Sequence, residues 1–125
     1  MTPEQLAKAN TEHAHQVALM AWCAINFRRL PKLKLLFAIP NGGERNPIVA
    51  ARMKAEGVRS GVPDLMLPVA RHGMHGLFIE MKKPRTGTVS EKQDQWHNDL
   101  RGEGFAVAVC YGWQEAVECL ERWFT

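Results

Sequence analysis

The feature that most constrains the fold is a pair of apolar runs with charged residues set into them, at residues 62–69 and 77–82. Successive side chains on a strand point to opposite faces, so Glu80 and Lys82 in the second run share a face. The segment between the runs is rich in glycine and histidine, which predicts a turn and therefore an antiparallel hairpin. In such a hairpin Asp64, at the start of the first run, lies close to Glu80 and Lys82.

Two acidic side chains in this hairpin predict a site for a divalent cation. Carboxylates about 4 Å apart repel each other by roughly 4 kcal/mol at an effective dielectric constant near 20. The single positive charge of Lys82 cancels only part of that repulsion. A small set of oxygen ligands with room for water and phosphate suits Mg²⁺ or Mn²⁺ better than Zn²⁺.

Other chemistries find less support in the sequence. The pairs His13/His15 and His72/His75 lack the additional ligands of a recognised zinc site, and the histidines are expected on solvated loops and helix surfaces, with His97 near the acidic site. No cysteine has a neighbouring base, and no nucleophile elbow is present. The sequence also has no glycine-rich phosphate loop.

The totals are those of one globular domain, residues 1–125, which can bury about two-thirds of its unfolded surface. A net charge of +3 and a pI near 8.9 are compatible with nucleic-acid binding without establishing it. The cysteines, Cys23, Cys110 and Cys119, are odd in number and far apart, which favours buried thiols in a reducing compartment. Without a leader or a membrane-length apolar run, a cytoplasmic protein is expected.

Periodicity and capping signals predict eight main elements. The helices are expected at residues 11–29, 46–57, 90–104 and 113–124, and the strands at residues 33–39, 62–69, 77–82 and 105–111. The last strand is almost wholly apolar, so it should be covered on both faces. Pro68 lacks an N–H donor and predicts an early end or a bulge in its strand.

The first helix is apolar on nearly all sides beyond its first turn, so it should be buried on more than one side. A single sheet would leave part of it uncovered, namely Leu19, Met20, Cys23 and Phe27. Two surfaces could cover these residues: a second copy of the chain, or the C-terminal helix with Trp123 and Phe124.

The charged hairpin also resembles a known nuclease signature. Pro63-Asp64 followed by Glu80-Met81-Lys82 is similar to the PD-(D/E)XK pattern of restriction-endonuclease-like nucleases. The surrounding blocks resemble the VRR-NUC family, in the same order, from about residue 10 to the end of the chain; they are Asn41–Arg45, Gly57–Leu65, Phe78–Lys82, and Ser90–Gln93 with Trp96, His97, Leu100 and Gly104.

The resemblance implies a mixed α/β fold, the restriction-endonuclease-like αβββαβ core with helices on both faces of the sheet. It implies a Mg²⁺- or Mn²⁺-dependent DNA endonuclease with catalytic residues Asp64, Glu80, Lys82 and Gln93. The implied metal ligands are Glu12, Asp64, Glu80 and the backbone carbonyl of Met81. Two of these residues also have purely structural interpretations. Glu12 fits a solvated first turn of its helix, and Gln93 fits a capping box with Ser90.

The resemblance further implies contacts with DNA. The residues expected to bind it are Asn41, Arg45, Arg52, Lys54, Arg59, Ser60, Lys83 and Arg85, although the cations of the inserted helix also fit a solvated face. Family members of this size resemble junction resolvases, which implies branched DNA such as four-way junctions, a homodimer, no membrane, and in many cases a phage gene expressed in a bacterial host. The alternative is a DNA-binding or scaffold module on the same fold without turnover.

Overall fold

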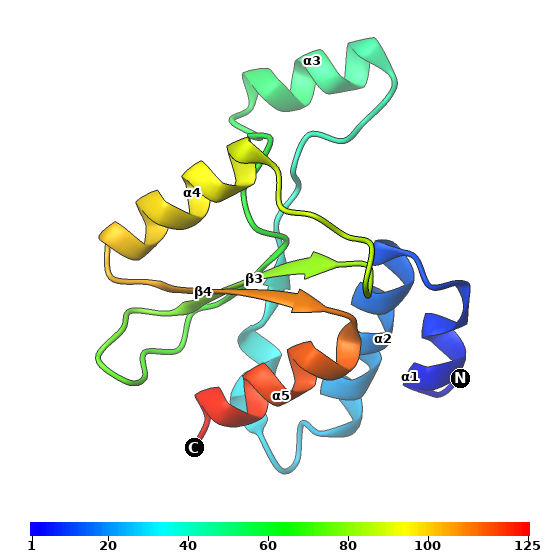
Figure 1. Cartoon of the computed structure of the whole chain (residues 1–125), viewed down its shortest axis with the longest axis vertical. Helices are drawn as coiled ribbons and strands as arrows, with labels where there is room; N and C mark the ends of the chain where they lie inside the picture. Colours follow the sequence, from blue (N-terminus) through cyan, green and yellow to red (C-terminus); the bar gives the residue numbers. More distant parts are fainter.

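The computed structural model describes all 125 residues as a four-stranded mixed sheet with helices on both faces (Figure 1). In chain order the elements are α1 (Pro3–Leu6), the 3₁₀ helix η1 (Ala7–Ala9), α2 (Glu12–Ile25), the 3₁₀ helix η2 (Pro31–Leu35), β1 (Phe37–Ala38), α3 (Pro47–Ala55), β2 (Leu65–Leu67), β3 (Leu77–Lys82), α4 (Glu91–Gly102), β4 (Ala106–Tyr111) and α5 (Trp113–Trp123). The sheet order is β1-β2-β3-β4, and only β3 and β4 run parallel. The predicted mixed α/β fold class is confirmed.

The hairpin of β2 and β3 forms as predicted. Leu65 pairs with Ile79 and Leu67 with Leu77 in an antiparallel register. Strand β2 ends at Leu67, because the next residue is Pro68, which cannot donate to the ladder. The register places Asp64, just before β2, opposite Glu80 on β3.

Strand β3 presents different side chains to the helices on its two faces. Leu77, Ile79 and Met81 belong to the hydrophobic core between the sheet and the helices α2 and α5. Glu80 and Lys82 point to the opposite face, where α4 packs, and both are buried. The predicted alternation along this strand is therefore correct, and it brings two charged side chains into the interior on the α4 side.

The chain itself covers the apolar helix α2. Leu19 and Cys23 are fully buried, and they belong to the same core cluster as Ala116 and Leu120 of α5. Helices α2 and α5 lie side by side under the sheet (Figure 1). Of the two surfaces considered from the sequence, the C-terminal helix is the one that covers this face, so the expectation that Leu19 and Cys23 need a second copy of the chain is wrong.

The predicted strand at residues 33–39 is largely wrong. Residues 31–35 form η2, and only Phe37 and Ala38 pair with β2. Pro31 at the first position of η2 favours a helical turn. Burial does not alternate along the segment either, because Leu33 and Leu36 are buried while Leu35 is exposed. The strand ends early because Pro40 follows.

The end of one helix and the burial of the last strand differ from the sequence prediction. Helix α2 ends at Ile25 rather than Arg29, because the Asn26 side chain donates to the Trp22 carbonyl at 2.9 Å and caps the helix. Helices α4 and α5 contact strand β4 from the two sides of the sheet, as expected, but the cover is incomplete (Figure 1). The strand lies at the edge of the sheet and most of its residues are only half-buried.

Helix α3 begins where expected, with Asn46 as its N-cap accepting from the backbone N–H groups of Ile48 and Val49. None of its residues is buried, and Ile48 is 74% exposed. Figure 1 shows α3 standing apart from the sheet, beyond α4.

No helix of the protein is both long enough and apolar enough to cross a membrane.

Candidate active site

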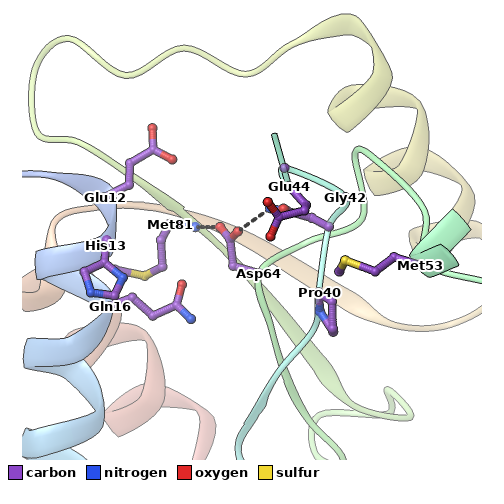
Figure 2. Close-up of a pocket in the computed structure, with 11 residues that line it drawn as sticks. Glu12, His13, Gln16, Pro40, Gly42, Glu44, Met53, Asp64 and Met81 are labelled. Atoms are coloured by element: carbon purple, nitrogen blue, oxygen red, sulfur yellow. Dashed lines mark hydrogen bonds between the residues drawn. The ribbon is translucent and has the colours of Figure 1, made fainter. Parts of the chain in front are cut away.

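Asp64 is held at the mouth of the hairpin by two hydrogen bonds. Its Oδ2 accepts from the backbone N–H of Met81 at 2.7 Å, and its Oδ1 accepts from the side-chain amide of Asn41 at 3.4 Å. Figure 2 shows the carboxylate between the first turns of α2 and the loop that follows β1. The β2–β3 pairing therefore fixes the position of Asp64 relative to Glu80.

Glu80 is almost completely enclosed, with 1% of its surface exposed. Its Oε1 lies 3.0 Å from Nε2 of His97, and its Oε2 accepts from the side-chain amide of Gln93 at 3.3 Å. Both partners come from α4, one helical turn apart. The face of α4 that packs on β3 is therefore polar at this point.

Gln93 connects Glu80 with Lys82. Its Oε1 accepts from Lys82 Nζ at 2.9 Å and from the backbone N–H of Ser90 at 2.9 Å, while the hydroxyl of Ser90 accepts from the Gln93 N–H. The capping box predicted from the sequence is present. The capping interpretation of Gln93 is thus confirmed. The same amide also contacts the buried Lys82 and Glu80, and its role in the site stays a prediction.

The electrostatics of Glu80 follow from this enclosure. Burial, then hydrogen bonding to Asp64 and the negative charge of Asp64, raise the pKa of Glu80 to about 9, although the ammonium of Lys82 acts in the opposite direction. Burial and the nearby Arg101 lower the pKa of His97. In the absence of a cation the site therefore holds a protonated carboxyl beside a neutral imidazole at neutral pH.

A cavity of about 600 Å³ opens beside Asp64 (Figure 2). It is lined by Glu12, His13 and Gln16 of α2, by Pro40, Asn41, Gly42, Gly43 and Glu44 of the loop after β1, and by Met53, Asp64 and Met81. Glu80 and Lys82 do not line it, because they are buried on the α4 side of β3. Asp64 is thus the acid that connects the cavity with the buried charged residues.

The structure limits the ligand set for a metal ion. No group of three histidine, cysteine or acidic side chains is close enough to hold a metal ion by itself. Glu12 lines the same cavity as Asp64, and its role as a metal ligand stays a prediction. The carboxylates are close enough that the negative charges of Asp64 and, more weakly, of Glu12 help to raise the pKa of Glu80. A divalent cation would relieve this repulsion, and Mg²⁺ commonly takes one or two carboxylates and completes its shell with water and phosphate. The residues present fit such an ion.

Comparison with known proteins gives the family. The family model of the VRR-NUC domain matches residues 5–114. The chain belongs to the VRR-NUC family. A solved structure described as a VRR_NUC domain protein superposes with a TM-score of 0.75 at 27% sequence identity, over 90% of this chain and 87% of that chain. No curated protein matches. Family membership makes this a nuclease-type domain.

The residues expected to contact DNA are divided between three places in this VRR-NUC domain. Asn41 lies at the acidic cavity. Lys54, Arg59 and Ser60 line a second cavity of about 490 Å³ between α3 and α4, where Lys92 and Trp96 form the other wall. The remaining cations are all exposed, just before α3, on α3, and on the loop after β3; they are Arg45, Arg52, Lys83 and Arg85. None of these cations forms a salt bridge with an acid of the protein.

His97 lies near the acidic site as expected, but the sequence did not predict its contact with Glu80. The expectation that the other histidines lie on solvated surfaces is wrong for His15, which is 5% exposed. His97 is 2% exposed. The available signal was the spacing on α4. His97 follows Gln93 by four residues, and residues four apart share a helix face, so both point at Glu80.

Proposed function

We propose that the protein is a Mg²⁺- or Mn²⁺-dependent DNA endonuclease with a preference for branched DNA. The observation that carries the proposal is the juxtaposition of Asp64 and Glu80 across the β2–β3 hairpin, with Lys82 joined to Glu80 through Gln93, in a domain of a nuclease family. Buried acids facing a phosphate would weaken a pure DNA-binding surface, so their presence favours catalysis over a scaffold role.

In this function Asp64, Glu80 and the Met81 carbonyl would hold the divalent ion. When bound, the ion supplies electrostatic stabilisation of the charge that develops on the scissile phosphate. Asp64 is the ligand at the cavity, and its bond to the Met81 N–H holds it in place. Glu80 supplies a second oxygen from the buried side. Glu12, at the cavity rim, adds negative charge that favours a cation.

Lys82 would stabilise the pentavalent transition state and orient the attacking water. Its Nζ is held by Gln93 at 2.9 Å, so the ammonium is positioned before substrate arrives. Its effect is therefore expected mainly on the transition state rather than on DNA binding. Gln93 serves as the support that keeps Lys82 and Glu80 in a fixed relation.

DNA would lie across the exposed cations beside the cavity. Lys54 and Arg59 of the second cavity lie on the far side of Gly42, which lines both cavities. A strand whose phosphate sits at Asp64 would extend towards these cations, with Arg45, Arg52, Lys83 and Arg85 tracking the flanking phosphates. Contacts of this kind are independent of base sequence.

Paired cleavage of a four-way junction requires two active sites, and each chain carries one Asp64–Glu80–Lys82 set. We therefore infer that two chains act as a two-fold homodimer on branched DNA. Light scattering measures the assembly, and a comparison of four-way junctions with linear duplex measures the preference. A monomer at micromolar concentration that cuts linear duplex as fast as a junction contradicts this part of the proposal.

The central experiment combines metal binding with cleavage. Asp64→Asn and Glu80→Gln should lose calorimetrically measured Mn²⁺ binding and cleavage of supercoiled and branched DNA, while Glu118→Gln, an exposed acid on α5, should behave as wild type. Unchanged Mn²⁺ affinity in both site variants contradicts the metal assignment. DNA binding by wild type without cleavage in either metal would support the scaffold alternative.

A further inference from the structure

The contact between His97 and Glu80 is the only ion-pair geometry in the protein between two buried side chains. Nε2 of His97 lies 3.0 Å from Oε1 of Glu80, with 2% and 1% of the two side chains exposed. The partners come from different elements, α4 and β3, and lie 17 residues apart in the chain. Their pairing therefore depends on the packing of α4 against the sheet.

Stability alone is a weak reason for such a pair. Burying two polar side chains costs desolvation, and apolar side chains of similar volume usually stabilise a protein as well or better. The layer beside this pair is already apolar, because Phe78 on the same face of β3 packs edge-to-face with Phe105. Glu80 and Lys82 are the buried polar residues on that face, and Glu80 is the second acid of the site.

Two side chains of α4, Gln93 and His97, form hydrogen bonds with different oxygens of Glu80. Gln93 binds Oε2 but is committed at the same time to Lys82 and to the cap of α4. His97 has Glu80 as its side-chain partner at Nε2, and the buried ring cannot swing away. The orientation of the carboxylate about its own bond is thus set by His97, since a rotation of Oε1 would break this hydrogen bond.

We propose that His97 is a positioning residue, which donates its Nε2–H to Oε1 of Glu80 and holds that carboxylate in the orientation needed to bind the divalent ion. The inference rests on the proposed function, because it assigns His97 to the same metal site. Groups that orient a metal ligand typically change metal affinity by about 10–100-fold when they are removed.

The test compares substitutions that keep or remove the donor. His97→Phe fills the volume without a donor, so its Mn²⁺ affinity by calorimetry should fall by about 10–100-fold. His97→Gln can place an amide N–H near the position of Nε2, so its affinity should stay within about threefold of wild type, a smaller change than the 10–100-fold loss expected without the donor. His75→Phe, on an exposed loop, is the matched control and should bind Mn²⁺ as wild type does.

Stability is measured on the same variants to separate positioning from folding. A folded His97→Phe protein with wild-type Mn²⁺ affinity overturns the inference. If His97→Phe does not fold, His97→Gln is compared with His97→Asn, whose shorter amide cannot reach Oε1; equal Mn²⁺ affinities of these two overturn the inference, and weaker binding by His97→Asn supports it. A wild-type protein that binds no Mn²⁺ overturns the proposed function and this inference together, whereas wild-type binding with unaltered His97 variants removes only the role of His97.

Discussion

The raised pKa of Glu80 predicts an unusual dependence of stability on pH in the metal-free protein. The folded protein keeps a proton on Glu80 up to about pH 9, whereas the unfolded chain releases it near the ordinary value of 4.5. Between these values the folded state binds one more proton than the unfolded state. Raising the pH therefore favours unfolding, and the free energy of unfolding decreases.

The size of the effect follows from one proton. At the full difference of one bound proton, the free energy of unfolding falls by about 1.4 kcal/mol per pH unit. For a domain of this length that corresponds to about 5 °C in Tm between pH 7 and pH 8. In this window His15 and His97, whose pKa values are lowered, are largely neutral in both states, and the thiol of Cys23, with a pKa raised to about 12, contributes only nearer pH 9. The mutual hydrogen bond of Cys110 and Cys119 raises the pKa of the first thiol and lowers that of the second. Both thiols are present in the wild type and in the Glu80 variant, so the difference between the two slopes isolates Glu80.

The assay is urea or thermal unfolding in EDTA at several pH values between 7 and 8. Glu80→Gln should abolish the slope, and Glu118→Gln on the surface of α5 should retain it. Because a metal ion binds the ionised carboxylate, Mn²⁺ affinity of the wild type should rise about tenfold over the same pH unit. A wild-type slope of zero, or a slope that survives in Glu80→Gln, refutes the reasoning.

Three further predictions concern residues around the site and the core. Lys82→Ala should abolish cleavage while leaving DNA affinity within a few fold, measured by single-turnover kinetics and binding titration; parallel loss of both would contradict a transition-state role. Removing Arg52 and Lys54 should weaken DNA binding similarly on all sequences. The slope of the logarithm of the binding constant against the logarithm of the salt concentration should become shallower by about 0.9 for each phosphate interaction removed. An unchanged slope would mean that these two side chains are solvated and do not contact phosphate. The His15 ring accepts a hydrogen bond from the Trp113 N–H at 3.1 Å, at the start of α5, and burial lowers the pKa of His15. The free energy of unfolding should therefore fall as the pH drops below about 6.5. In denaturant titrations His15→Ala should reduce that pH dependence and cost about 1–3 kcal/mol of stability.

The sequence predicted those features that depend on short-range patterns. The period of two in β3 gave the shared face of Glu80 and Lys82, and the turn residues between the runs gave the hairpin that brings Asp64 to them. The capping signals at Ser90 and Asn46 likewise predicted two helix starts to the residue. Each of these patterns is determined by neighbours in the chain.

The features that the sequence did not predict depend on contacts between distant segments. Leu19 and Cys23 are covered by α5, which lies about ninety residues later, and no local pattern distinguishes that cover from a second copy. The His97–Glu80 contact requires the packing of α4 on β3. Residues 33–39 have a strand-like composition, but their two flanking prolines restrict the ladder to two residues.

Helix α3 can change in sequence without disturbing the core of the fold. It supplies cations beside the acidic cavity but no buried side chain, so its sequence is under little packing constraint. Substitutions, insertions or a replaced segment between Asn46 and Glu56 leave the core cluster under the sheet intact. Under the proposed DNA contacts, the strength of phosphate binding can therefore be varied by substitutions in this segment alone, with the Asp64–Glu80 hairpin kept constant.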